Sequence, residues 1–127
     1  MYEDLIGEFL AQKRFAVVGS FRNESKYAYK ILKNLKQKGY KVYPINPRIK
    51  KVEEIKCYPT VLDLPIAVDV VDIVTPPLAT EKIVEQCLKK GITRVWLQPG
   101  AESETAIRYC MDNNIKVIYN ACVMLGK

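Results

Sequence analysis

Hydrophobic and polar positions change their spacing along the chain in a regular way. Short apolar runs between polar loops predict strands buried on both faces, and the segments between them repeat their apolar residues at the period of a helix. The predicted strands are residues 15–18, 41–45, 56–58, 68–74, 94–97 and 116–119. The predicted helices are residues 2–12, 27–38, 80–90 and 102–113. Strand 56–58 is expected to be short and to lie at an edge of the sheet.

Several residues mark where these elements should begin and end. Gly39 and Gly91 follow two of the helices and predict their C-terminal ends. Thr80 has the side chain of a good N-cap, so the helix that ends before Gly91 is expected to start there. Pro47 cannot donate to a sheet ladder and closes the strand before it. In the irregular stretch 48–65, a turn of helix is expected before Leu64.

The alternation of short strands and helices predicts parallel, right-handed βαβ units. We therefore expect an α/β protein: a Rossmann-like open parallel sheet with helices on both faces and, numbered along the chain, the strand order 3-2-1-4-5-6. The length of 127 residues fits a single domain, residues 1–127. Open parallel sheets bind ligands beyond the C-terminal ends of their strands, here between the first and fourth strands.

The loop after the first predicted strand combines a glycine with positive charge. Gly19 would let the backbone turn tightly beside Ser20, and the helix that follows has a positive N-terminus. Arg22 and Lys26 add full positive charges, so a diphosphate is the ligand that this loop is best suited to bind. Taken singly, Gly19 is as readily a simple turn and Arg22 a solvated loop residue; the combination at the switch point favours a binding site.

This loop lacks the dinucleotide-binding pattern. That pattern requires G-x-G-x-x-G, of which only Gly19 is present, and an acidic residue at the end of the second strand. The second strand is followed instead by Asn46, Pro47 and Arg48. A basic residue there suits a phosphorylated ribose, which both NADP and coenzyme A carry, and disfavours NAD.

Two further loops should reach the same edge of the sheet. A rigid extended segment is expected at Thr75, Pro76 and Pro77, and it would suit an adenine or a pantetheine arm. The same residues are equally explained as the end of the preceding strand. Gln98 and Gly100 could contact amide groups of a ligand, or could simply connect a strand to the next helix.

The composition is that of an ordinary globular protein, with 49% hydrophobic and 27% charged residues. Lys and Arg number 20 against 14 Asp and Glu, which gives a net charge of +6. Such a balance favours anionic partners, but surface lysines that keep the protein soluble would produce the same total.

The chain contains no histidine and four cysteines. A Ser-His-Asp triad, a Cys-His pair and a 2-His-1-carboxylate iron site are therefore excluded within it, and no metal site is predicted.

Cys87, Cys110 and Trp96 are expected in the core. Unpaired cysteines without a signal peptide favour a cytoplasmic location. No apolar run reaches the roughly 20 residues of a membrane helix.

A series of short motifs runs through the chain from about Phe15 to Cys122. They are Ala16-Val17-Val18-Gly19-Ser20 with Arg22-Asn23, and residues 42–47, 57–60, 68–73 and 95–100. In this order they resemble the loops of small stand-alone CoA-binding proteins and of the CoA-binding domain of the succinyl-CoA synthetase alpha subunit. The specificity lies in the series, because each motif is short. Glu24 departs from the family loop, which often has proline there.

The resemblance implies a non-catalytic module that binds coenzyme A or an acyl-CoA at the C-terminal edge of the sheet. In the synthetase the reaction also uses a phosphorylated histidine, which this chain lacks, so the binding function carries over and the ligase reaction does not. The implied roles are phosphate binding by Gly19, Ser20, Arg22 and Lys26, adenosine contacts by Asn46, Pro47 and Arg48, flanking contacts by Thr75, Pro76 and Pro77, and a pantetheine path along Gln98 and Gly100.

Cys122 matches the cysteine that follows the last strand in such domains. A thiol at the mouth of the crevice could form a mixed disulfide with coenzyme A. An inert cysteine is the alternative.

Other readings stay open beside this one. The second is an NADP-binding, reductase-like protein, and the third is a nucleic-acid-binding protein suggested by the net charge. The tyrosines are scattered rather than interleaved with lysines, so no nucleic-acid partner is expected, and no membrane partner either. A homodimer or a protein partner is left open, because residues 2–12 could cover a sheet face or a partner.

Overall fold

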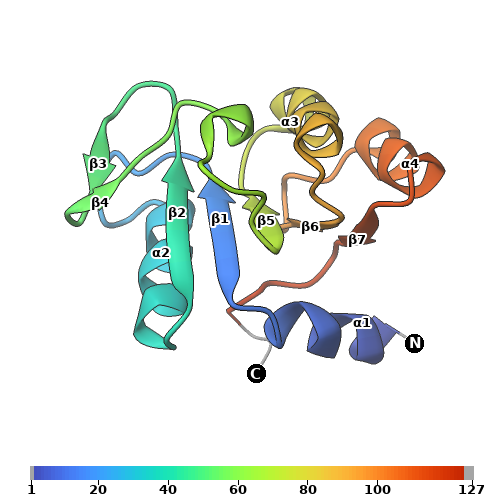
Figure 1. Ribbon diagram of the computed structural model, residues 1–127, viewed down its shortest axis with the longest axis horizontal. Helices are drawn as coiled ribbons and strands as arrows, with labels where there is room; N and C mark the ends of the chain where they lie inside the picture. The colour runs from blue at the N-terminus through green and yellow to red at the C-terminus, as the bar shows by residue number, and fades with distance from the viewer. Residues whose placement is uncertain (1, 125–127) are drawn as a thin grey trace.

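A parallel sheet of five strands forms the centre of the protein in a computed structural model that describes residues 2–124 (Figure 1). Its strands are β1 (Arg14–Val18), β2 (Lys41–Ile45), β5 (Val70–Ile73), β6 (Arg94–Leu97) and β7 (Lys116–Ile118), in the order β2-β1-β5-β6-β7. Each neighbouring pair is parallel. The Rossmann-like α/β fold is therefore confirmed, with the sheet order reversing between β1 and β5.

The predicted edge strand at 56–58 is confirmed in part. Tyr58 makes an isolated parallel bridge to Ile45, which holds it in the outermost position of the predicted order. The residues before it form an antiparallel hairpin instead, β3 (Lys51–Val52) with β4 (Ile55–Lys56).

Helices cover both faces of the sheet, as predicted. On one face, α1 (Tyr2–Leu10) and α2 (Tyr27–Gln37) pack on a core that includes Phe15, Val17 and Trp96. On the other, α3 (Pro77–Lys90), α4 (Glu104–Asp112) and the 3-10 turn η1 (Val61–Asp63) pack on Ala16, Val18 and Val71. The turn of helix expected before Leu64 is η1. Trp96, Cys87 and Cys110 are fully buried, as expected.

The start of α3 differs from the prediction. The helix begins at Pro77 with Pro76 as its N-cap, because proline's fixed φ suits the first turn and its missing N–H costs nothing there. Thr80 is therefore inside the helix and fully buried, where its Oγ1 lies 2.8 Å from Oγ1 of Thr75. In α4, Ser103 is the N-cap and accepts a hydrogen bond from the N–H of Ala106 at 3.2 Å.

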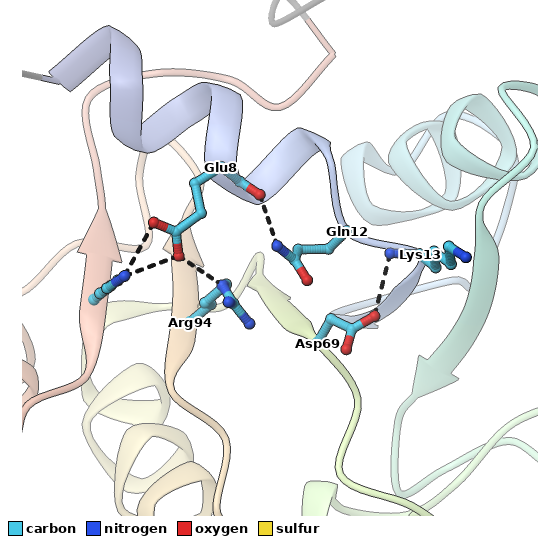
Figure 2. A network of polar contacts seen from close by, with 6 residues as sticks. Glu8, Gln12, Lys13, Asp69 and Arg94 are labelled. Carbon is cyan, nitrogen blue, oxygen red and sulfur yellow. Dashed lines mark hydrogen bonds and ion pairs between the residues drawn. The ribbon is translucent and has the colours of Figure 1, made fainter.

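Helix α1 is fastened near the N-terminal ends of the strands (Figure 2). The carboxylate of Glu8 lies 2.9 Å from Nε of Arg94, which opens β6, and 3.0 Å from Nζ of Lys116, which opens β7. These two cations lower the pKa of Glu8. Phe9 is fully buried against Trp96, with ring centroids 6.0 Å apart. This helix therefore covers a sheet face and leaves the C-terminal edge of the strands open.

Candidate functional site

A cleft of about 580 Å³, here called the first cleft, opens beyond the C-terminal ends of β1, β2 and β5. It contains more than half of the predicted site: Gly19, Ser20, Asn46, Pro47, Arg48, Thr75 and Pro76. Its other lining residues are Val18, Ile45, Pro59, Thr60, Val61, Val74, Ala79, Lys82, Ile83 and Gln86. Its place at the reversal of strand order agrees with the position predicted for a ligand.

A second cleft of about 560 Å³ lies on the other side of the segment Thr75-Pro76, which lines both. Tyr27, Val74, Pro99, Gly100 and Ala101 complete its lining. Gly100 has a φ of +97°, a left-handed conformation that favours glycine in this loop. The segment Thr75-Pro76 is thus a wall between two hollows of similar size, one beside β2 and one beside the loop after β6.

Gly19 is required for packing rather than for a left-handed turn. Its φ is not positive, but a Cβ added to it would lie 2.6 Å from Cβ of Ala28 in α2 and 2.9 Å from the carbonyl oxygen of Val74. The absence of a side chain therefore lets α2 and the end of β5 approach the floor of the first cleft. The close approach seen at Gly19 is to the protein's own backbone and side chains, and its proposed contact with a ligand stays a prediction.

Asn46 ties three loops together at the rim of the first cleft. Its Nδ2 donates to the carbonyl oxygen of Gly19 at 2.6 Å, and its Oδ1 accepts from the N–H of Arg48 at 2.8 Å. Its own N–H donates to the carbonyl oxygen of Tyr58 at 2.9 Å. Because its amide is used internally, Asn46 fixes the positions of Gly19 and Arg48.

The helices that begin beside the two clefts lack side-chain caps. No side chain caps α2 at Lys26 or α3 at Pro76, whereas Ser103 caps α4 and Thr60 caps η1. An uncapped helix N-terminus carries partial positive charge and can accept an anion. The two uncapped helices follow β1 and β5, the strands between which the sheet order reverses.

Several predicted residues do not line either cleft. Arg22 is exposed and Lys26 half-buried in the loop before α2, and Pro77 is exposed at the start of α3. Along the chain, each of the three lies within two residues of a residue that lines a cleft.

Gln98 is an interior residue, and the idea that it borders a ligand is not supported. Its side chain is 0% exposed, its Nε2 donates to Oδ1 of Asp72 at 3.3 Å, and its Oε1 accepts from the N–H of Val123 at 3.1 Å. Both ends of the amide are therefore engaged inside the protein. Burial raises the pKa of Asp72 well above its usual range.

Cys122 contacts Tyr27 and lines neither cleft. It is 8% exposed, and its Sγ is hydrogen-bonded to the hydroxyl of Tyr27, a lining residue of the second cleft. Burial and the contact with Cys122 raise the pKa of Tyr27 to about 12, so its hydroxyl stays protonated at neutral pH. The mixed disulfide with coenzyme A stays a prediction, for a thiol that is buried and hydrogen-bonded in this structure.

Reasoning from the loops alone missed the contribution of α3. Ala79, Lys82, Ile83 and Gln86 follow the spacing i, i+3, i+4, i+7 and so form one helix face, which lines the first cleft. That spacing is visible in the sequence, but the predicted helix starts at Thr80 and so leaves out Ala79. Within residues 2–124, no cluster of possible metal ligands occurs, and no helix is long and apolar enough to cross a membrane.

Comparison with known proteins gives one family. Residues 13–126 match the model of the family described as "CoA binding domain". The chain is 39% identical over 106 residues to "Acetate--CoA ligase [ADP-forming]" of Methanocaldococcus jannaschii, an alignment that covers 84% of this chain and 15% of that enzyme. The chain thus corresponds to a small part of the curated relative it matches.

Solved structures include similar proteins both small and large. A hypothetical protein from Pyrococcus horikoshii OT3 is 34% identical with a TM-score of 0.93, and the match covers 99% of this chain and 89% of that one. The dinucleotide-forming acetyl-coenzyme A synthetase 1 of Ca. Korarchaeum cryptofilum, in complex with phosphate and ADP, is 33% identical with a TM-score of 0.77. That match covers 91% of this chain and 27% of the synthetase.

Proposed function

Because the chain belongs to the CoA binding domain family, we propose that it binds coenzyme A, or an acyl-CoA, across the two clefts at the C-terminal edge of the sheet. The observation that carries this proposal is the first cleft, which lies at the reversal of strand order. Arg48 and Lys82 are the charged residues of its lining, which contains no acid, so the donor set fits a phosphorylated ligand.

The two clefts suit different parts of the ligand. The first cleft joins basic side chains to apolar ones such as Ile83, as an adenosine with a phosphorylated ribose requires. Gly19, Ser20 and the uncapped N-termini of α2 and α3 suit the diphosphate. The wall Thr75-Pro76 then leads to the second cleft, where the pantetheine end would lie between Tyr27 and Gly100.

The role we propose is that of a binding, carrier or regulatory module without a reaction of its own. The sequence has no histidine that could act as a base or carry a phosphate. The titratable residues that line the two clefts are Arg48, Lys82 and Tyr27, and the raised pKa of Tyr27 makes it a poor base at neutral pH. The free cysteines fit a reducing compartment, so a cytoplasmic location remains a prediction.

The test is calorimetric titration of the protein with coenzyme A, acetyl-CoA, NADP and NAD at moderate salt. We expect a dissociation constant on the order of micromolar for coenzyme A or acetyl-CoA and no measurable heat with NAD or NADP. Binding of NADP without coenzyme A would support the reductase-like alternative and contradict the proposal.

A matched pair of variants ties the binding to the first cleft. Ala79→Trp would fill the cleft from α3 and is expected to weaken coenzyme A binding by tenfold or more, about 1.4 kcal/mol. Leu78→Trp adds the same side chain at the neighbouring position, which is 77% exposed and lines neither cleft, and should change the affinity less than about twofold. Equal effects of the two substitutions would place the ligand elsewhere.

A further inference from the structure

The first cleft holds two cations from independent elements. Arg48 lies in the loop after β2, and Lys82 lies on α3. Both residues are exposed, and neither forms a salt bridge within the described residues 2–124. Since no acid lines this cleft, the two positive charges are free to act on a ligand.

The two residues come from elements of different kinds. Lys82 projects from the face of α3 that also carries Ala79, Ile83 and Gln86, and that helix extends from Pro77 to Lys90. The backbone at Arg48 is held by its N–H, which donates to Oδ1 of Asn46. One cleft is therefore lined by a lysine from a helix and an arginine from a loop.

Coenzyme A carries phosphates of two kinds. Each phosphate of the diphosphate bears about one negative charge, which backbone N–H groups and helix N-termini can bind. The 3′-phosphate of the ribose is a monoester with about −1.5 to −2 charges at pH 7, and it is the group that gains most from two full cations. Resting on the proposed function, we infer that Lys82 together with Arg48 binds this 3′-phosphate and selects coenzyme A over its dephosphorylated form.

The test compares coenzyme A with 3′-dephospho-coenzyme A by calorimetry. The wild type is expected to bind coenzyme A about tenfold more tightly than the dephosphorylated form, and Lys82→Gln should weaken coenzyme A binding about fivefold while changing dephospho-coenzyme A by less than about twofold. Lys89→Gln is the matched control, because Lys89 is exposed on the same helix, has the same charge and does not line the cleft. It should leave both affinities unchanged.

Two results would overturn the inference: equal affinity of the wild type for both compounds, or a Lys82→Gln variant that weakens both by the same factor. A wild type that binds neither compound refutes the proposed function. In that case adenosine 3′,5′-bisphosphate and AMP serve as smaller probes. A preference for the bisphosphate that disappears in Lys82→Gln would still support the phosphate site, and the absence of a preference would contradict it.

Discussion

Gly19→Ala is expected to lower the free energy of unfolding by about 2 kcal/mol and to weaken coenzyme A binding at least tenfold. The new Cβ would lie 2.6 Å from Cβ of Ala28 and 2.9 Å from the carbonyl oxygen of Val74, distances that neither atom can relieve without moving α2 or the end of β5. Either movement displaces Ser20 and the wall Thr75-Pro76, which line the first cleft. Chemical denaturation and calorimetry measure the two effects.

The same substitution elsewhere in the chain provides the control. Gly7 lies in α1, and a Cβ added there meets nothing within 4 Å, so Gly7→Ala should stabilise the protein by about 0.5–1 kcal/mol and leave binding unchanged. In the Gly19→Ala background, Ala28→Gly removes one of the two clashes and should restore part of the stability. A Gly19→Ala protein as stable as the wild type would contradict the packing role of Gly19.

Asp72→Asn is expected to stabilise the protein at pH 7 by about 2 kcal/mol. The carboxyl of Asp72 is 0% exposed, and its Oδ2 has no hydrogen-bond partner within the described part of the chain. Its Oδ1 accepts from Nε2 of Gln98 at 3.3 Å, a bond that an asparagine carbonyl oxygen can also accept. The substitution therefore removes the cost of a buried carboxyl and retains its one contact.

The pH dependence of this effect follows from the raised pKa of Asp72. The pKa of aspartate in an unfolded chain is about 3.9. Above that pH the folded state binds more protons than the unfolded state, so the free energy of unfolding falls until the pH reaches the pKa of Asp72 in the folded state. The advantage of Asp72→Asn should vanish below about pH 3.9 and grow as the pH rises. Denaturant unfolding of both proteins from pH 3 to pH 8 measures it.

Asp69 supplies the control for this experiment. Its carboxylate is half-buried, and its Oδ2 accepts from the backbone N–H groups of Lys13 and Arg14 at 3.2 and 2.9 Å. Asp69→Asn is therefore expected to be neutral or destabilising at pH 7. If Asp72→Asn is the less stable of the two variants at that pH, the account of Asp72 is wrong.

The parts of the fold that depend on local patterns could be predicted from the sequence. The strands were visible because their apolar runs are bounded by polar loops, and the glycines at 39 and 91 marked helix ends. The hairpin β3–β4 was not predicted, because its turn is made by Glu53 and Glu54 with φ of +51° and +66°, conformations usually signalled by glycine or asparagine.

The parts that depend on tertiary contacts could not be predicted in this way. Asp72 lies in an apolar run that correctly predicts a strand, but its hydrogen bond with Gln98, the residue after β6, joins two residues 26 positions apart. Nothing local to Gln98 signals this partner, so the sequence predicts a ligand contact there. The loops of the first cleft were predicted because the C-terminal ends of parallel strands meet at one edge. Lys82 was missed because the packing of α3, which turns its face toward that edge, is not a local property.

Chemical-shift mapping of backbone amides during titration with coenzyme A shows whether the ligand binds at the C-terminal edge of the sheet. A third hollow of about 550 Å³, lined by Lys13, Arg14, Lys38 and Lys41 among others, lies near the N-terminal ends of β1 and β2 and offers a basic alternative. We expect large shifts at Gly19, Ser20, Arg48, Ala79 and Gly100, with Gly39 and Lys41 unaffected. Shifts confined to residues 12–14 and 38–41, or no shifts at all, would contradict binding at the C-terminal edge.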